Sequence, residues 1–239
     1  MTMRSEITAE FRTDLHPCSV EALKSIDSYS LSTASRNREI NFFLCSSYEL
    51  DDKTDLRNGE IVLFKLEENS IVPIERVKLN SGVLDVKIHN HLVILATSCG
   101  SLDILRLNYS KITKYESFST SEEEASLFHT VRSISKEDEG LFLSVDINRC
   151  TGSEDSNENL HIYISTQNGS ILLYSFKDGN IIEILHLKRA HVMFGECMPV
   201  WIAVLDPFFN SILITGGDDC LMKVKNIYTI VIRIFITKL

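Results

Sequence analysis

Short runs of alternating apolar and polar residues, separated by turn-forming residues, recur along this chain. The clearest example is ILITGGDDCLMKVKN (212–226), in which an apolar run, a Gly-Gly-Asp-Asp turn and a second alternating run follow one another. Three earlier segments repeat this arrangement, at residues 42–68, 93–108 and 162–176. Alternation with a period of two between turn signals is typical of half-buried antiparallel strands. The pattern therefore predicts four strand pairs with the same internal order.

The spacing of the four turns indicates a repeated unit. The turns start at Gly59, Gly100, Gly169 and Asp219, with spacings of 41, 69 and 50 residues. A unit of about 40–45 residues is typical of WD-type propellers, whose blades have four strands. The sequence therefore predicts an all-β fold, a WD40-type β-propeller of which about four blades can be recognised.

Further strands complete each unit. One precedes three of the pairs, at 82–88, 141–147 and 200–206, and we expect it on the outer side of the blade. Fourth strands are expected within 70–79 and 180–187. No stretch long enough for a core helix shows sustained helical periodicity.

Two polar segments explain the longest spacing. Residues 116–140 and 149–159 are rich in Ser, Glu, Asp and Asn, and we expect them to form solvated, mobile loops. The stretch HPCSVEALKSI (16–26) fits either a short helix or a strand, and the pattern does not decide between them. A closed propeller usually has more than four blades, so we expect this one to be incomplete, with the C-terminal blades missing.

Composition narrows the class of partner. The 239 residues include 24 Lys and Arg against 33 Asp and Glu, and this net charge of −9 disfavours binding to nucleic acid. The six cysteines form no Cys-x-x-Cys pair and no cluster with zinc spacing, so we expect neither a metal nor a cofactor. Scattered cysteines and an N-terminus without a signal sequence favour a cytoplasmic protein. The apolar run at 227–236 is too short to span a bilayer, so no membrane partner is expected.

Several stretches, in order along the chain, resemble the diphthine methyl ester esterase family, the diphthine methyltransferase-like WD-repeat proteins of diphthamide biosynthesis. They are TDLHPCSVEAL (13–23), CSSYEL with RNGEIVLFKL (45–66), GVLDVKI (82–88), LFLSVDI (141–147) and RAH (189–191) with VWIAVLDPFFNSILITGGDDCLMK (200–223). The last of these is the most specific. The resemblance covers roughly residues 13–223.

The resemblance implies a carboxylic ester hydrolase. The family's reaction is hydrolysis of the methyl ester of diphthine methyl ester on eukaryotic elongation factor 2, which gives diphthine and frees its carboxylate for later amidation to diphthamide. The implied partner is elongation factor 2 bearing methylated diphthine, which carries a trimethylammonium group. A non-catalytic WD-repeat scaffold for protein–protein interaction is the alternative, because one fold hosts many functions.

Ester hydrolysis needs an activated water or nucleophile, a base, and donors for the oxyanion. The sequence contains neither Gly-x-Ser-x-Gly nor His-Glu-x-x-His, so the groups would come from loops on one propeller face. The candidate catalytic residues there are His191, Asp218, Asp219 and Glu196. A His–Asp pair could orient a water, and carboxylates would attract a trimethylammonium group.

These candidates have a structural alternative. His191, Asp219 and Thr215 can form the buried hydrogen-bond network of a WD-type blade, whereas the adjacent Asp218 cannot fill the same position. Trp201 is the only tryptophan, and we expect it to pack in the core of the blade rather than to bind a cation.

The repeat breaks off in the second strand of its last unit. A WD-type blade usually closes this strand on Trp-Asp, and here Lys225 and Asn226 stand at those positions. We therefore expect a partial propeller at 1–226 and a divergent apolar tail at 227–239. One hypothesis is that the tail is translated intron, since Val-Lys is compatible with a splice start. An open propeller exposes a sheet edge, so the chain is expected to be insoluble or oligomeric and inactive as an esterase.

Overall fold

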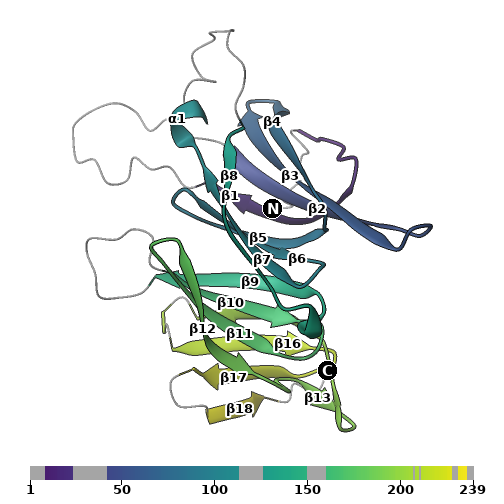
Figure 1. Ribbon diagram of the computed structural model, residues 1–239, viewed down its shortest axis with the longest axis vertical. Coiled ribbons are helices and arrows are strands. Elements are labelled where there is room, and N and C mark those ends of the chain that lie inside the picture. Colours follow the sequence, from purple (N-terminus) through teal and green to yellow (C-terminus); the bar gives the residue numbers. More distant parts are fainter. Residues whose placement is uncertain are drawn as a thin grey trace, which may run out of the picture.

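Four antiparallel sheets of four strands each make up the computed structural model of the chain, which confirms the all-β prediction (Figure 1). The structure describes residues 9–23, 42–112, 126–149, 160–206, 208–209, 211–227 and 231–235. We call the sheets blades 1 to 4, and within each blade the strands are neighbours in the order of the sequence.

The strands of blade 1 are β1 (His16–Ala22), β2 (Phe42–Asp51), β3 (Leu56–Glu67) and β4 (Ser70–Leu79). Those of blade 2 are β5 (Val83–His89), β6 (Leu92–Thr97), β7 (Ser101–Leu107) and β8 (Phe128–Ser135). Those of blade 3 are β9 (Phe142–Arg149), β10 (Leu160–Thr166), β11 (Ile171–Lys177) and β12 (Asn180–Leu187). Those of blade 4 are β15 (Val200–Leu205), β16 (Ile212–Gly217), β17 (Met222–Asn226) and β18 (Val231–Phe235). The remaining elements are α1 (Tyr109–Ile112), the 3-10 turn η3 (Glu137–Glu139) and a hairpin of β13 (Val192–Met193) and β14 (Glu196–Cys197).

The central strands of a blade are apolar on both faces because each blade is packed between two neighbours. In β6, Val93 and Leu95 belong to the core between blades 1 and 2, whereas Leu92 and Ile94 belong to the core between blades 2 and 3. All four side chains are at most 1% exposed. A third core joins blades 3 and 4. Since burial of one large aliphatic side chain contributes about 1.5–3 kcal/mol, these cores hold the sheets together.

Hydrogen bonds tie the first strands of neighbouring blades to one another. Ser19 Oγ donates to Asp85 Oδ1 at 2.7 Å, and Asp85 Oδ2 accepts from the backbone N–H of Val145 at 2.9 Å. Ser144 Oγ in turn accepts from the backbone N–H of Ala203 at 3.0 Å. These contacts run from β1 through β5 and β9 to β15. The first strands therefore converge on the inner side of the arc, as in a propeller.

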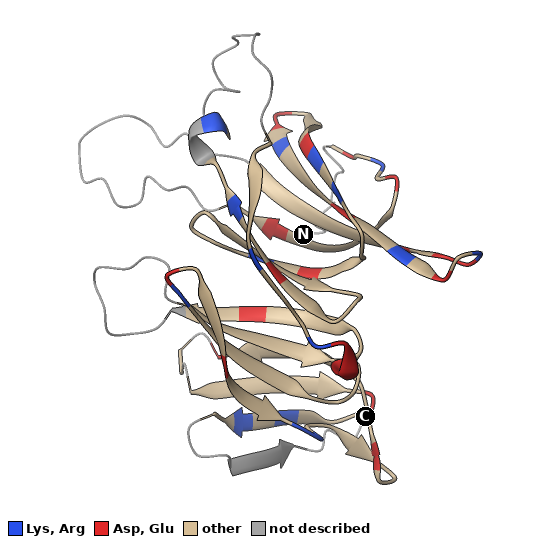
Figure 2. Ribbon diagram, in the orientation of Figure 1, with Lys and Arg blue, Asp and Glu red and all other residues tan. Residues whose placement is uncertain are grey.

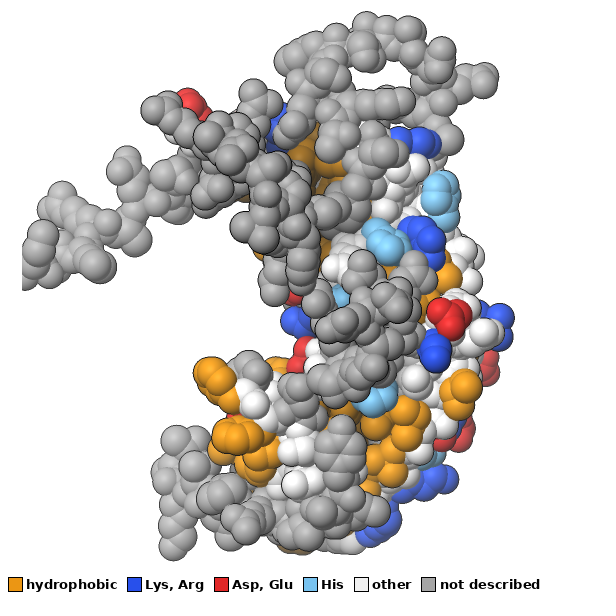
Figure 3. All heavy atoms as spheres, turned by 90° about the vertical axis from the view of Figure 1, so that its left-hand side faces the viewer, with side chains coloured by type: hydrophobic (Ala, Val, Ile, Leu, Met, Phe, Trp, Pro, Cys, Tyr) orange, Lys and Arg blue, Asp and Glu red, His pale blue; other side chains and the backbone are white. Residues whose placement is uncertain are grey.

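This arrangement corrects one prediction. The strands within 82–88, 141–147 and 200–206 are β5, β9 and β15, and they lie on the inner side of their blades rather than the outer side. The alternation of apolar and polar residues does not distinguish the two edges of a sheet, because both edge strands have one unpaired side. Figure 3 shows that the described part of the molecule curves around a hollow.

Other strand predictions have mixed outcomes. The fourth strands expected within 70–79 and 180–187 are confirmed as β4 and β12, and the undecided stretch 16–26 contains the strand β1. The loop predicted at 116–140 is wrong in part, because β8 occupies Phe128–Ser135 and packs apolar side chains against the neighbouring core. The remainder of that loop up to residue 125, and residues 150–159, lie outside the described residues.

The turns between the second and third strands lie at one end of the blades, on the right of Figure 1, and we call this end the turn face. Gly100, Gly169 and Cys220 take the same position with positive φ, at 70°, 81° and 57°. Gly59 does not form a turn: it lies inside β3, where an added Cβ would approach backbone atoms at 2.5–2.8 Å, and the blade 1 turn is at 52–55. A close backbone approach, rather than a turn, thus explains this glycine.

Blades 1 and 4 differ in the contacts that the structure describes at their outer sides. On the outward face of blade 1, Phe11 packs edge-on against Phe64 with ring centroids 5.0 Å apart, and Asp14 pairs with Arg76. In blade 4, β18 pairs with β17, so part of the predicted tail completes the sheet. Among the described residues no helix is long and apolar enough to cross a membrane.

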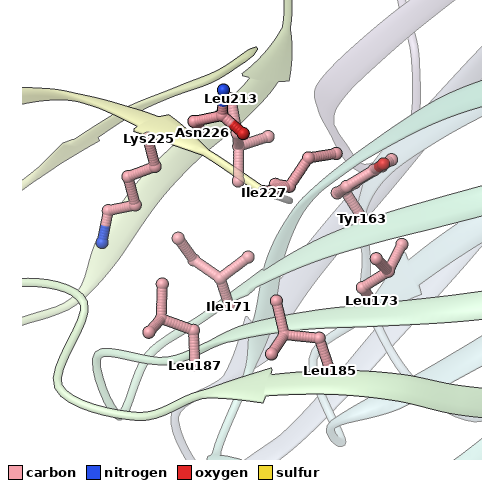
Figure 4. A pocket seen from close by; sticks show the side chains of 9 residues that line it. All are labelled: Tyr163, Ile171, Leu173, Leu185, Leu187, Leu213, Lys225, Asn226 and Ile227. Atoms are coloured by element: carbon pink, nitrogen blue, oxygen red, sulfur yellow. The ribbon is translucent and has the colours of Figure 1, made fainter. Parts of the chain in front are cut away.

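A cavity of about 40 Å³ lies between blades 3 and 4 (Figure 4). It is lined by Tyr163, Ile171, Leu173, Leu185, Leu187, Leu213, Lys225, Asn226 and Ile227. Lys225, at the position where a WD-type blade usually carries Trp, is only 3% exposed. Its ammonium group points away from the cavity in Figure 4 and donates to the carbonyl oxygen of Ala190 at 3.2 Å. A lysine stem and unfilled space thus occupy the region that an indole would fill.

The buried lysine predicts a pH-dependent stability. Burial, assisted by the nearby Lys223 ammonium, lowers the pKa of Lys225 from 10.5 to about 8. Between these values the unfolded chain binds more protons than the folded chain, so stability rises with pH. We predict that Lys225 raises the free energy of unfolding, measured with urea, by on the order of 2 kcal/mol between about pH 7 and about pH 10. Burial raises the pKa of Cys45 and Tyr174, which lowers stability in the upper part of this range, so the contribution of Lys225 is the difference between the parent chain and a variant without this lysine.

Lys225→Met is the matched test of this assignment. The variant should be more stable than the parent chain at neutral pH and should lose most of the increase at high pH. The carbonyl of Ala190 keeps a partner, because Lys223 Nζ also donates to it at 3.0 Å. An unchanged pH profile in the variant would show that the cost of burying Lys225 has been misassigned.

Candidate functional site

One buried hydrogen-bond network occupies the turn end of blade 4. His191 Nδ1 lies 2.6 Å from Asp219 Oδ1, and His191 Nε2 lies 2.9 Å from Thr215 Oγ1. Lys223 Nζ donates to Asp219 Oδ2 at 2.7 Å and to the carbonyl oxygen of Ala190 at 3.0 Å. His191 and Thr215 have no exposed surface, and the side chain of Asp219 is 1% exposed. The network therefore links the segment before β13 to β16, β17 and the turn between them.

The backbone around His191 fixes the ring in this position. The N–H of Ala190 donates to the carbonyl of Gly169 in the blade 3 turn at 2.7 Å, and the N–H of Met198 donates to the carbonyl of His191 at 3.0 Å. On the other side, a Cβ at Gly217 would lie 2.8 Å from Cγ and Nδ1 of His191. The imidazole is thus held between the turn of blade 3 and the sheet of blade 4, and glycine is needed beside it.

The surroundings determine the protonation of the network. Burial and the Lys223 ammonium lower the pKa of His191, against the opposing effect of Asp219, so the imidazole is neutral. Burial alone would raise the pKa of Asp219, but the hydrogen bonds from His191 and Lys223 outweigh it, and its pKa lies below the usual value. A neutral imidazole that donates from Nδ1 to Asp219 must accept at Nε2, so Thr215 donates to it.

Asp218 lies outside this network although it is adjacent to Asp219. Its side chain is exposed, and its Oδ1 accepts a hydrogen bond of 2.5 Å from Trp201 Nε1. Glu196 is exposed on β14, in the hairpin between blades 3 and 4. The structure therefore brings His191 and Asp219 together and places Asp218 and Glu196 at separate points on the turn face.

The prediction that Trp201 packs in the blade core is wrong. Its side chain is among the exposed large hydrophobic groups, with 56% of the residue accessible. Trp201 lies at a β-bulge, since Val200 pairs with Gly217 while Ile202 pairs with Gly216. A bulge turns a side chain out of the regular alternation, which the sequence pattern alone does not reveal.

These positions define what the candidate residues can do chemically. Both ring nitrogens of His191 are engaged and the ring has no contact with solvent, which is the geometry of a structural network. The carboxylates of Asp218 and Glu196 are the candidates that reach solvent. The catalytic role of all four residues stays a prediction. Among the described residues no group of three or more His, Cys, Asp or Glu side chains could hold a metal ion.

Lys223 belongs to the network but was not among the residues predicted for the site. Lysines are almost always exposed, so a strand lysine is normally assigned to the solvent side. The signal in the sequence was the alternation itself. Lys223 pairs with Thr215 across the ladder and, like Lys225, occupies an inward-facing position of β17.

We predict that His191→Ala destabilises the chain by about 2–4 kcal/mol, because it leaves Thr215 and Asp219 without their buried partner. The measurement is urea unfolding followed by circular dichroism. Asp218→Asn is the matched control, and its exposed position should keep the change within about 0.5 kcal/mol. A stable His191→Ala chain that has lost ester hydrolysis would instead support a catalytic role for the imidazole.

Comparison with known proteins agrees with the resemblance found in the sequence. The chain is 25% identical over 217 residues to the protein named diphthine methyltransferase homolog of Dictyostelium discoideum, which covers 77% of this chain and 50% of that protein. It is 24% identical over 199 residues to the diphthine methyltransferase of Mus musculus, covering 75% of this chain and 38% of the mouse protein. No family model matches the chain. The chain thus spans half or less of the length of these curated relatives.

A solved structure supports the fold independently. The crystal structure of Sqt1 from Chaetomium thermophilum, a WD40 protein, superposes on 90% of this chain with a TM-score of 0.57 and 10% sequence identity, over 44% of its own length. Similarity at this level of identity shows the architecture alone. The four blades are therefore a stretch of WD40-type β-propeller, in a chain whose sequence is similar to proteins named for diphthine methylation.

Proposed function

We propose that this chain acts in diphthamide biosynthesis as a hydrolase that removes the methyl group of diphthine methyl ester on elongation factor 2. The observation that carries the proposal is the similarity to two curated proteins named diphthine methyltransferase or its homolog, over about three quarters of the chain. Elongation factor 2 acts in the cytoplasm, and we propose the same location for this chain.

The charge of the turn face supports a cationic substrate. Figure 2 shows acidic residues at this end of the molecule, in η3 and in the hairpin of β13 and β14. Glu196 and Asp218 contribute exposed carboxylates beside blade 4. Methylated diphthine carries a trimethylammonium group and no compensating carboxylate, so an acidic face favours its approach.

Hydrolysis of the ester requires water to attack the carbonyl carbon and methanol to leave with a proton. A solvent-exposed carboxylate can accept a hydrogen bond from the attacking water, orient it and take up its proton. We assign this task to Asp218 or Glu196, because the imidazole of His191 is saturated by Asp219 and Thr215. The network of His191 would then position the turn that carries Asp218.

A scaffold without catalytic activity is the second candidate. The observation that favours it is the engagement of His191 in the interior of blade 4, which leaves the described part of the turn face without an exposed His–Asp pair. In this case the chain would bind elongation factor 2 and leave the ester intact.

Single-turnover hydrolysis distinguishes the two candidates. The chain in molar excess is incubated with elongation factor 2 that carries the methylated diphthine, and methanol and the remaining ester are measured together. The sequence predicts an inactive chain because the repeat breaks off within blade 4, but β18 completes that sheet. We therefore expect slow turnover rather than none, and the chain is used in excess for this reason. We predict release of one methanol per substrate, slowed about 10-fold or more by substitution of the carboxylate that acts as base, with Asp218→Asn and Glu196→Gln compared in parallel.

Asp55→Asn is the matched control for charge, because Asp55 is exposed in the turn of blade 1, away from blade 4. It should leave both binding and methanol release unchanged. Binding of the methylated substrate with no release of methanol by the parent chain would favour the scaffold.

A further inference from the structure

A β-bulge recurs at the same register in the first strand of every blade. In each case one residue is skipped by the ladder to the second strand, and these residues are Cys18, Leu84, Leu143 and Trp201. In blades 2 to 4 the bulge lies at the turn face, because the residue paired beside it is the last of the second strand: Thr97, Thr166 or Gly217. In blade 1 the second strand continues past the bulge to Asp51. The bulge is common to the four blades, but the side chain at the bulge differs. The residue type at this position can therefore vary without a change in the sheet.

At the fourth of these positions the side chain is large, aromatic and exposed. Trp201 is 56% accessible, and it is the only tryptophan in the sequence. Its indole N–H donates to Asp218 Oδ1, which fixes one edge of the ring to the turn between β16 and β17. An indole held by its N–H edge leaves its aromatic face open to a ligand. The carboxylate of Asp218 then places negative charge beside that face.

This combination fits a quaternary ammonium group. The face of an indole attracts a cation through its quadrupole, most strongly for a cation that is poorly hydrated, and methylated ammonium groups are recognised by aromatic faces in this way. A quaternary ammonium has no N–H donor, so a carboxylate alone would bind it no better than it binds the ammonium of a lysine. An aromatic face beside a carboxylate supplies both contact area and charge.

We propose that Trp201, clamped by Asp218, is the binding platform for the trimethylammonium group of the substrate. This inference rests on the proposed function, because it is methylated diphthine that brings such a group to the turn face. Trp201 is a specificity-determining residue in this account and takes no part in bond breaking. It selects the fully methylated amine and brings the adjacent ester to the exposed carboxylates.

The first experiment uses the fluorescence of Trp201, the only tryptophan in the sequence, to detect binding. Choline is titrated against the full chain, and 3,3-dimethylbutanol, which has the same shape without the charge, is titrated in parallel. Choline should change the indole fluorescence with a dissociation constant on the order of millimolar, and the neutral compound should have little effect at the same concentrations. Equal responses to the two compounds, or no response to choline, would overturn the platform.

The second experiment measures affinity for elongation factor 2 carrying methylated diphthine. Trp201→Leu should weaken binding about 5-fold or more, whereas Trp201→Phe, which keeps an aromatic face, should lie between it and the parent chain. Phe194→Leu is the matched control, because Phe194 is 95% exposed at the tip of the hairpin of β13 and β14. Circular dichroism and the urea midpoint verify that each variant remains folded.

The outcomes separate this inference from the proposed function. Equal affinity of the parent chain and Trp201→Leu for the methylated substrate, with methanol still released, would refute the platform and leave the hydrolase intact. A selective loss of affinity in Trp201→Leu, with no methanol released by any form of the chain, would support the platform on a scaffold and refute the hydrolase.

Discussion

Packing between neighbouring sheets is the interaction on which the rest of this structure depends. A single four-stranded sheet with two apolar faces has no stable existence in water, and here each face finds a partner in the next blade. The alternation in β6 shows the principle, since its odd and even residues enter two different cores. The turn face exists only because these cores hold the ends of the blades at one level. Every candidate residue for function lies at those ends.

The interface between blades 3 and 4 is less apolar than the other two. It contains an imidazole, a carboxylate and two lysines, where the other interfaces contain mainly aliphatic side chains. The two ammonium groups of Lys223 and Lys225 share the carbonyl of Ala190, and Lys223 alone reaches Asp219. Lys225 therefore carries the larger share of the desolvation cost, and a cavity lies beside it. The polar groups of this interface fix the turn between β16 and β17, but the side chains there pack less completely than in the other interfaces.

Most of the fold could be predicted from the sequence because alternation and turn residues are local signals. The strand pairs around Gly100 and Gly169 follow from them directly. The association of His191 with Asp219 is not local, and it was predictable only from the hydrogen-bond network of WD-type blades. Alternation does not show which edge of a blade lies inside, where a bulge interrupts the ladder, or whether a glycine serves a turn or a close contact. For these reasons the sequence alone places β5 at the wrong edge of its blade, Gly59 in a turn and Trp201 in the core.

The three cores also have a consequence for how the molecule is built. Each is formed by blades that are adjacent in the sequence, so each can form as soon as the following blade has left the ribosome, with no wait for distant parts of the chain. On the outward side of blade 1, Phe11 can already contact Phe64 and Asp14 can pair with Arg76 during this time. Growth of the structure is therefore vectorial, because each new blade covers the apolar face of the blade before it.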